Sequence, residues 1–239
     1  MISAALKGAW LTLLAGPMRL SAMAYRRLRA PRSGVVRVQL GPGRRNYLEG
    51  WINVDANFVT ARLDVWADLR GALPFPDGTV DVIYSHHVIE HLPDGQLPSH
   101  FREMHRCLKP GGLVRIAGPN ADGAIKKLLE GDASWFPDFP ERREGGGGRF
   151  NNFLLCANEH RSLLTWAYLS ELATAAGFAE LRSCRSGVET ARPDLVDLAL
   201  LATEEREDLE VQHTIVLEAV KPASGAALPA AAASTMMRP

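Results

Sequence analysis

The chain has 239 residues, with 27 Lys and Arg against 27 Asp and Glu, so its formal net charge is zero. The chain as a whole therefore lacks the excess of positive charge that many nucleic-acid-binding proteins have. Its apolar and charged fractions are those of a globular protein. The length suits one α/β domain or two small ones. Three widely separated cysteines form no metal-ligand or disulfide pattern, which fits a reducing cytoplasm.

Residues 1–33 carry six basic side chains and no acidic one. The pair Gly16-Pro17 predicts a break into two short helices. A secretory signal is disfavoured because Arg19 and the run "YRRLR" are poorly placed for export, and the apolar run is too short to cross a bilayer. Two interpretations remain: an amphipathic arm on the inner face of an anionic membrane, and a helix packed over the following domain.

From Val35 onward, strand and helix patterns alternate, which predicts an α/β fold: a doubly wound, mostly parallel seven-stranded Rossmann-like sheet with helices on both faces. The helix expected at 98–112 has Phe101, Met104 and Leu108 on one face. A second helix is expected at 162–178, with Ser162 as its N-cap and Gly177 as its stop. The predicted strands are 35–40, 50–55, 63–69, 80–85, 113–119, 179–184 and 213–220.

Two segments look irregular, one inside the predicted 34–222 domain and one after it. Residues 131–158 place five aromatic side chains around the glycine run 145–148, which is consistent with a lid over a substrate or with a surface loop held by a few aromatics. Residues 223–239 are of low complexity, and we expect a disordered tail there.

Polar or glycine residues follow four consecutive predicted strands. "LGPG" follows the first, Asp55 ends the second, Asp68-Leu69 ends the third, and Ser85-His86-His87 ends the fourth. Ligands of doubly wound sheets bind at the carboxyl ends of the strands. A carboxylate there can accept two hydrogen bonds from a ribose diol, so the pattern predicts a nucleoside site. A dinucleotide site is disfavoured, because Asn46 stands at the third glycine position and Asp55 comes sooner than the usual 20 or so residues.

The order "LGPG", "WINVD", "ADLRGALPFPDG", "VIEHL", "LKPGG" resembles the class I S-adenosylmethionine-dependent methyltransferases of the small-molecule type. It is similar to the subgroup with the pattern G-x-G, GWxNVD, LPF, EHL and LKPGG, over about residues 35–120. Gln39 stands where the family often has an acid, and Pro42 replaces a common cysteine or small residue. The resemblance implies S-adenosyl-L-methionine as cofactor, with these contact residues: Gly41, Pro42, Gly43, Asp55, Ala56, Asp68, Leu69, Ser85 and His86.

Methyl transfer to a hydroxyl or an ammonium group also requires removal of a proton, for which histidine is suited near neutral pH. The candidate bases are His86, His87 and His160, and each also fits a structural role. His87 and His91 have helical i, i+4 spacing, but the resembling family has "EH" here without metal. We therefore expect no metal, and expect Glu90 with His91 to fix the helix against the sheet.

The acceptor is less constrained. "YSHH" is not an [Asp/Asn]-Pro-Pro-[Tyr/Phe] pattern, which disfavours methylation of an adenine or glutamine amino group, and no basic groove indicates nucleic acid. A small molecule, a sugar or a lipid-linked glycan remains, with O-methylation favoured and possible membrane contact through residues 1–33. The alternatives are a catalytically silent cofactor-binding scaffold, a membrane-surface adaptor, and a nicotinamide-dependent oxidoreductase, which "LKPGG" also disfavours.

Overall fold

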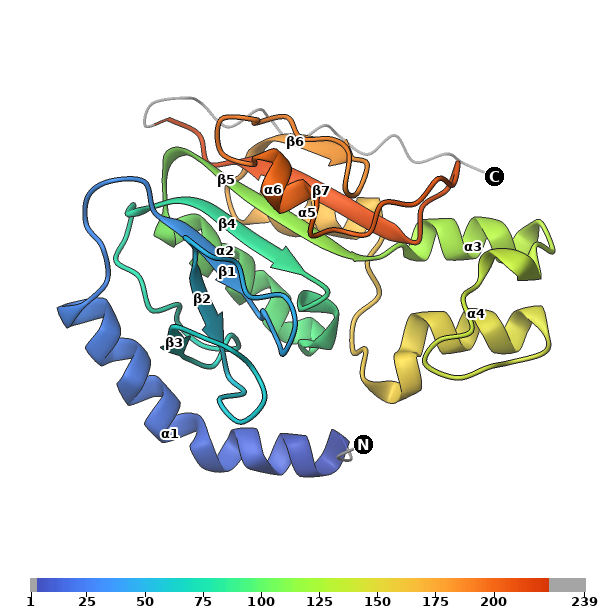
Figure 1. Cartoon of the computed structure of the whole chain (residues 1–239), viewed down its shortest axis with the longest axis horizontal. Coiled ribbons are helices and arrows are strands. Elements are labelled where there is room, and N and C mark those ends of the chain that lie inside the picture. The colour runs from blue at the N-terminus through green and yellow to red at the C-terminus, as the bar shows by residue number, and fades with distance from the viewer. Residues whose placement is uncertain (1–3, 224–239) are drawn as a thin grey trace.

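The computed structural model describes residues 4–223, so the predicted tail lies outside the described residues from 224 onward (Figure 1). Within that range, seven strands form one sheet in the order β3-β2-β1-β4-β5-β7-β6. The strands are β1 (Arg37–Leu40), β2 (Ile52–Asp55), β3 (Val65–Trp66), β4 (Val80–His86), β5 (Leu108–Pro119), β6 (Ala179–Cys184) and β7 (Thr214–Val220). The predicted α/β class is confirmed.

The strand order reverses next to β1. β1 pairs in parallel with both β2 and β4, β2 pairs in parallel with β3, and β4 pairs in parallel with β5. β7 is antiparallel to both β5 and β6. The carboxyl ends of β1 and β4 therefore lie on either side of a topological switch point, where doubly wound sheets bind their ligands.

Apolar side chains on the two sheet faces are covered differently. α2 and α5 pack on one face and bury Phe101, Met104 and Leu169 against the central strands, and Figure 1 shows both helices behind the sheet. The other face is covered by α6 and by Leu48 and Trp51, which replace a helix between β1 and β2. The helices are α1 (Ala4–Leu28), α2 (Leu97–Cys107), α3 (Ala121–Leu129), α4 (Gly146–Leu155), α5 (Trp166–Ala175) and α6 (Leu198–Leu201).

The predicted break of the N-terminal arm is wrong: α1 is a single helix with Pro17 inside it. Figure 1 shows α1 changing direction along its length, as expected where proline removes a helical hydrogen bond. Met18 and Ala22 are buried against the domain, which supplies the packing that keeps the helix formed. Among residues 4–223, no helix combines the length and the apolar character that a bilayer crossing requires.

The segment 131–158 is more ordered than its glycine run predicts. α4 begins at Gly146 inside that run and packs beside α3 (Figure 1). Trp135 and Phe136 are buried, while Phe139 is 67% exposed. Aromatic packing thus overrides the low helix propensity of glycine.

The helix expected to start after Ser162 starts at Trp166, with the Thr165 side chain accepting a hydrogen bond from Tyr168 N. Ser162 is held elsewhere: its backbone N–H donates to Glu90 O, and its hydroxyl donates to Leu92 O. These bonds tie the chain before α5 to the segment after β4.

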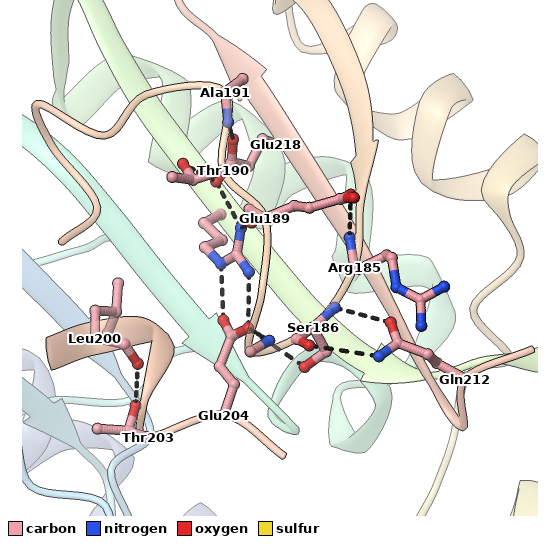
Figure 2. A network of polar contacts seen from close by, with 12 residues as sticks. Arg185, Ser186, Glu189, Thr190, Ala191, Leu200, Thr203, Glu204, Gln212 and Glu218 are labelled. Atoms are coloured by element: carbon pink, nitrogen blue, oxygen red, sulfur yellow. Dashed lines mark hydrogen bonds and ion pairs between the residues drawn. The ribbon is translucent and has the colours of Figure 1, made fainter. Parts of the chain in front are cut away.

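A buried ion network fixes the segment before β7 to the sheet. Arg115 of β5 donates to both carboxylate oxygens of Glu204 at 2.7 Å and to Glu218 of β7 at 2.6 Å. Glu204 also accepts from Gly187 N, and Glu218 accepts from the Thr190 hydroxyl (Figure 2). All three charged side chains are at most 1% exposed, so the network has no access to a ligand and has a structural role.

Candidate functional site

The turn after β1 requires glycine at two positions. Gly41 has φ +66°, and a Cβ there would lie 2.5 Å from Val88 Cγ2. Gly43 has φ +56° but faces open space. Pro42 between them is buried. The absence of side chains therefore lets the end of β1 lie close to the segment after β4 and leaves the backbone of Gly43 accessible.

Asp55, at the end of β2, holds this turn in place. Its carboxylate accepts hydrogen bonds from Gly43 N at 3.0 Å and from Asn57 N at 2.8 Å. A carboxylate has about four lone-pair sites, so Asp55 retains capacity for two further donors. The next residue, Ala56, is half-buried, and its carbonyl accepts from Trp66 Nε1.

Asp68 and Leu69 follow β3 as predicted. Leu69 is buried, whereas Asp68 is half-buried and accepts a two-pronged ion pair from Arg70 at 2.7–3.1 Å. This bond raises the pKa of Arg70. Asp68 lines a cavity of about 680 Å³ between α1 and residues 68–73, to which α1 contributes Met18 and Arg19. α1 therefore covers the end of the site where the resemblance places adenine.

Unpartnered polar atoms lie on the two strands that border the switch point. Ser85 of β4 is fully buried, and its hydroxyl has no hydrogen-bond partner in the described structure. Gln39 of β1 is 2% exposed, and its Oε1 also lacks a partner there. Most buried polar atoms in native proteins are paired. These two are consistent with a polar ligand completing the site.

His86 and His87 occupy different environments. The His86 ring lies parallel to Tyr84, and burial lowers the pKa of His86 to about 4, so it is neutral at pH 7. His87 has the left-handed φ of +53°, and its Nδ1 lies 3.1 Å from Glu90 Oε1. Burial alone would lower the pKa of His87, but the Glu90 carboxylate outweighs burial and raises it.

His87 opens onto a second cavity, of about 470 Å³, which we call the histidine cavity. This volume is in the range of small-molecule sites. Its lining comes from the ends of β4 and β5, the 137–160 segment and the chain before β7. The lining residues are His87, Glu90, His91, Pro119, Pro137, Phe139, Pro140, Phe153, Cys156, His160, Glu205, Glu207, His213 and Thr214.

Two other histidines of this cavity have defined hydrogen bonds. His160 Nδ1 donates to Leu154 O at 2.8 Å, and burial lowers the pKa of His160. His213 is bonded through Nδ1 to Glu207 and through Nε2 to Trp135 O. Both of these partners are acceptors, so both ring nitrogens of His213 carry protons. His213 is therefore a cation that joins β7 to Trp135, and is not available as a base.

Two sets of predicted residues meet in the structure, while Asp68 lines the separate cavity beside α1. Gly41, Gly43 and Asp55 meet at the ends of β1 and β2, and His87 and His160 line the histidine cavity. The sequence did not reveal Glu90 as the partner of His87, because its carboxylate was expected to anchor the helix. It also gave no role to Glu205, Glu207 or His213, which no recognisable motif contains.

A family model described as a methyltransferase domain matches residues 9–182, which is more than half of the chain. The match begins inside α1 and ends inside β6. It therefore includes the glycine turn, Asp55, the end of β4 and the 131–158 segment. A comparison with curated proteins finds no match.

Solved structures share the fold. A S-adenosylmethionine-dependent methyltransferase of Thermotoga maritima, described as a possible histamine N-methyltransferase, has 16% identity and a TM-score of 0.52, over 91% of this chain and 96% of that one. A S-adenosylmethionine-dependent methyltransferase of Archaeoglobus fulgidus has 17% identity and a TM-score of 0.47, over 89% and 100%. Phosphoethanolamine N-methyltransferase 2 of Haemonchus contortus, solved with S-adenosyl-L-methionine, has 13% identity and a TM-score of 0.47, over 92% and 57%.

Proposed function

The chain belongs to the methyltransferase domain family and is a S-adenosylmethionine-dependent methyltransferase, and we propose that it methylates a hydroxyl group of a small molecule, a sugar or a glycan held in the histidine cavity. The observation that carries the proposal is the His87–Glu90 pair at the edge of that cavity.

The residues of the cofactor side fit S-adenosylmethionine. Gly41 and Gly43 leave room for the methionine part, and Asp55 retains lone pairs for the two ribose hydroxyls. Asp68 and Leu69 would contact adenine, and Ser85 and His86 would lie beside the methionine end. The unpartnered oxygens of Gln39 and Ser85 are consistent with a polar ligand of this kind. When bound, the cofactor would supply the methyl group of a positively charged sulfonium. The acceptor oxygen would attack this methyl group in line with the carbon–sulfur bond that breaks.

His87 would take the proton that the acceptor hydroxyl loses. Glu90 accepts the Nδ1–H of His87, so the Nε2 lone pair is the basic site, and Glu90 acts as a positioning residue. The mixed lining suits a sugar-like or aromatic alcohol acceptor: Glu205 and Glu207 provide hydrogen-bond acceptors for hydroxyl groups, while Phe139 and Phe153 can pack against apolar ring faces.

The test is methyl transfer from labelled S-adenosylmethionine to a panel of sugars, glycolipids, phenols and amines. We expect turnover with a hydroxyl acceptor. Replacing His87 by Gln should lower kcat by about 10²–10⁴, the usual contribution of general-base catalysis, with unchanged affinity for S-adenosylhomocysteine. His105→Gln, on α2 outside the cavity, is the matched control. Full activity of His87→Gln would show that His87 is not the base that accepts the proton of the hydroxyl group. Cofactor binding without turnover on any acceptor would favour the silent scaffold.

We also propose that the outer face of α1 contacts an anionic membrane surface, which would suit a lipid-linked acceptor. Leu13, Leu20 and Leu28 are 68–78% exposed on this helix, beside the exposed cation Arg27. An amphipathic helix with this composition binds anionic interfaces.

Flotation with phosphatidylglycerol vesicles tests this contact. The double variant Leu13→Glu, Leu20→Glu should lose vesicle binding, whereas Leu129→Glu, at an equally exposed leucine on α3, should not. Equal flotation of both variants, or no flotation of the wild type, would reject the contact.

A further inference from the structure

Three side chains converge at one wall of the histidine cavity. Glu90 and His91 belong to the short 3-10 helix Ile89–His91 after β4, and His160 comes from the segment before α5. One candidate ligand atom of each lies within 4.8 Å of the other two. We propose that Glu90, His91 and His160 bind a divalent transition-metal ion at the wall of the cavity.

The hydrogen bonds of the two imidazoles fix the tautomer that a metal ligand needs. His91 Nδ1 lies 3.0 Å from Glu159 O, and His160 Nδ1 lies 2.8 Å from Leu154 O. A carbonyl oxygen only accepts, so each Nδ1 carries the proton and each Nε2 keeps a free lone pair. Metal-binding histidines characteristically donate their second ring N–H in this way, which fixes the tautomer and the ring direction.

Glu90 supplies the carboxylate. Its side chain is 1% exposed, Oε1 is bonded to His87, and Oε2 has no hydrogen-bond partner in the described structure. A buried carboxylate oxygen without a partner is costly, so a native site normally satisfies it. A cation held by Oε2 would do so, while Oε1 continues to position His87.

The donor set indicates the kind of ion. Two imidazoles and one carboxylate suit zinc and other first-row transition metals, whereas magnesium and calcium prefer oxygen ligands. Three protein ligands also leave a coordination position open, as in catalytic rather than structural zinc sites. All three ligands line the histidine cavity, so an acceptor in the cavity would have access to the ion, which would polarise the acceptor oxygen as a Lewis acid.

This site differs from the pair suggested by the spacing of His87 and His91. The left-handed backbone of His87 directs that residue away from the helical register, and its ring is bonded to Glu90 instead. The partner that completes the cluster, His160, is almost seventy residues further along the chain. The proposed site therefore departs from the expectation of no metal, and metal binding by the protein decides between the two.

The test is direct metal binding by the full-length protein after chelation and gel filtration. Zn²⁺ titration by calorimetry should give one site per chain, and Co²⁺ should give visible absorption bands that Zn²⁺ abolishes. His91→Asn, His160→Asn and Glu90→Gln should each weaken Zn²⁺ affinity at least tenfold, since loss of even a supporting group typically costs 10–100-fold. His105→Asn, a histidine outside the cavity, should bind like the wild type.

Binding of S-adenosylhomocysteine to each variant checks folding and separates this inference from the proposed function. Retained cofactor binding with no stoichiometric Zn²⁺ or Co²⁺ binding would overturn the metal site alone. Zn²⁺ affinity unchanged in both histidine variants would overturn it as well, because the metal would then lie elsewhere.

Discussion

Buried polar groups in two regions of this protein differ in how completely they are hydrogen-bonded. In the Arg115 network, each charged side chain has hydrogen-bond partners. The Glu204 carboxylate, for example, accepts hydrogen bonds from Arg115, Gly187 and Ser186. At the ends of β1 and β4 and in the histidine cavity, by contrast, Gln39, Ser85, Glu90 and Thr214 each keep an unpartnered oxygen.

The difference helps to distinguish buried polar groups that stabilise the fold from buried polar groups that a ligand would contact. A fully paired network rigidifies the fold, and Arg115 connects β5, β7 and the 185–204 segment. Unpartnered atoms in a native interior call for another explanation, and these four lie on the strands that border the switch point and on the cavity wall, although His100 and Ser170 also have unpartnered atoms in the described structure. We interpret them as positions that a ligand completes.

The largest expected effect comes from breaking the paired cluster. Arg115→Met leaves Glu204 and Glu218 buried without their cation, which should lower the free energy of unfolding by about 3–5 kcal/mol. Urea unfolding followed by circular dichroism measures it. The control Arg62→Met removes an exposed pair with Glu49 and should cost less than about 1 kcal/mol. Equal losses would contradict the comparison.

Acid should weaken the same cluster. Burial opposes ionisation of Glu204, but the Arg115 hydrogen bonds outweigh burial and hold its pKa below the ordinary value of 4.5. A depressed folded-state pKa contributes stability above pH 4.5, and this contribution is lost as pH falls toward the folded pKa. Unfolding measured between pH 6 and pH 3 should therefore show a slope of up to about 1.4 kcal/mol per pH unit from this carboxyl.

The variant Glu204→Gln lacks that carboxyl. Its unfolding free energy should therefore be lower at pH 6 but should depend less on pH below 4.5 than that of the wild type. The same acid slope in wild type and variant would assign the pH dependence to other carboxyls.

Two threonines, one with a hydrogen-bonded hydroxyl and one without, allow the same comparison through smaller changes in stability. Thr190→Val removes a hydroxyl that donates to Glu218 and should cost about 1 kcal/mol or more. Thr214→Val removes a hydroxyl that has no partner in the described structure and should be near neutral or stabilising. Thermal unfolding of both variants tests the contrast. A larger loss for Thr214→Val would mean that its hydroxyl is satisfied within the fold.

The sequence predicted the sheet and the meeting of the glycine turn with Asp55, because both depend on local signals. Apolar runs specify the strands, and the glycines and acids that end them, Gly41 and Asp55 for example, are adjacent to those runs. Helix α4 was missed because its first turn is glycine and its stability comes from packing against Trp135 and Phe136. The meeting of Glu90 with His160 depends on tertiary folding alone, so no local pattern could indicate it.

The most direct test of the cofactor site is calorimetric binding of S-adenosylhomocysteine to the wild type, to Asp55→Ala and to the control Asp194→Ala, an exposed residue paired with Arg192. Loss of two hydrogen bonds to a charged acceptor should cost about 1.5–3 kcal/mol or more. We therefore expect micromolar binding by the wild type and the control, and at least tenfold weaker binding by Asp55→Ala. No binding by folded wild type, or equal binding by all three proteins, would contradict the account.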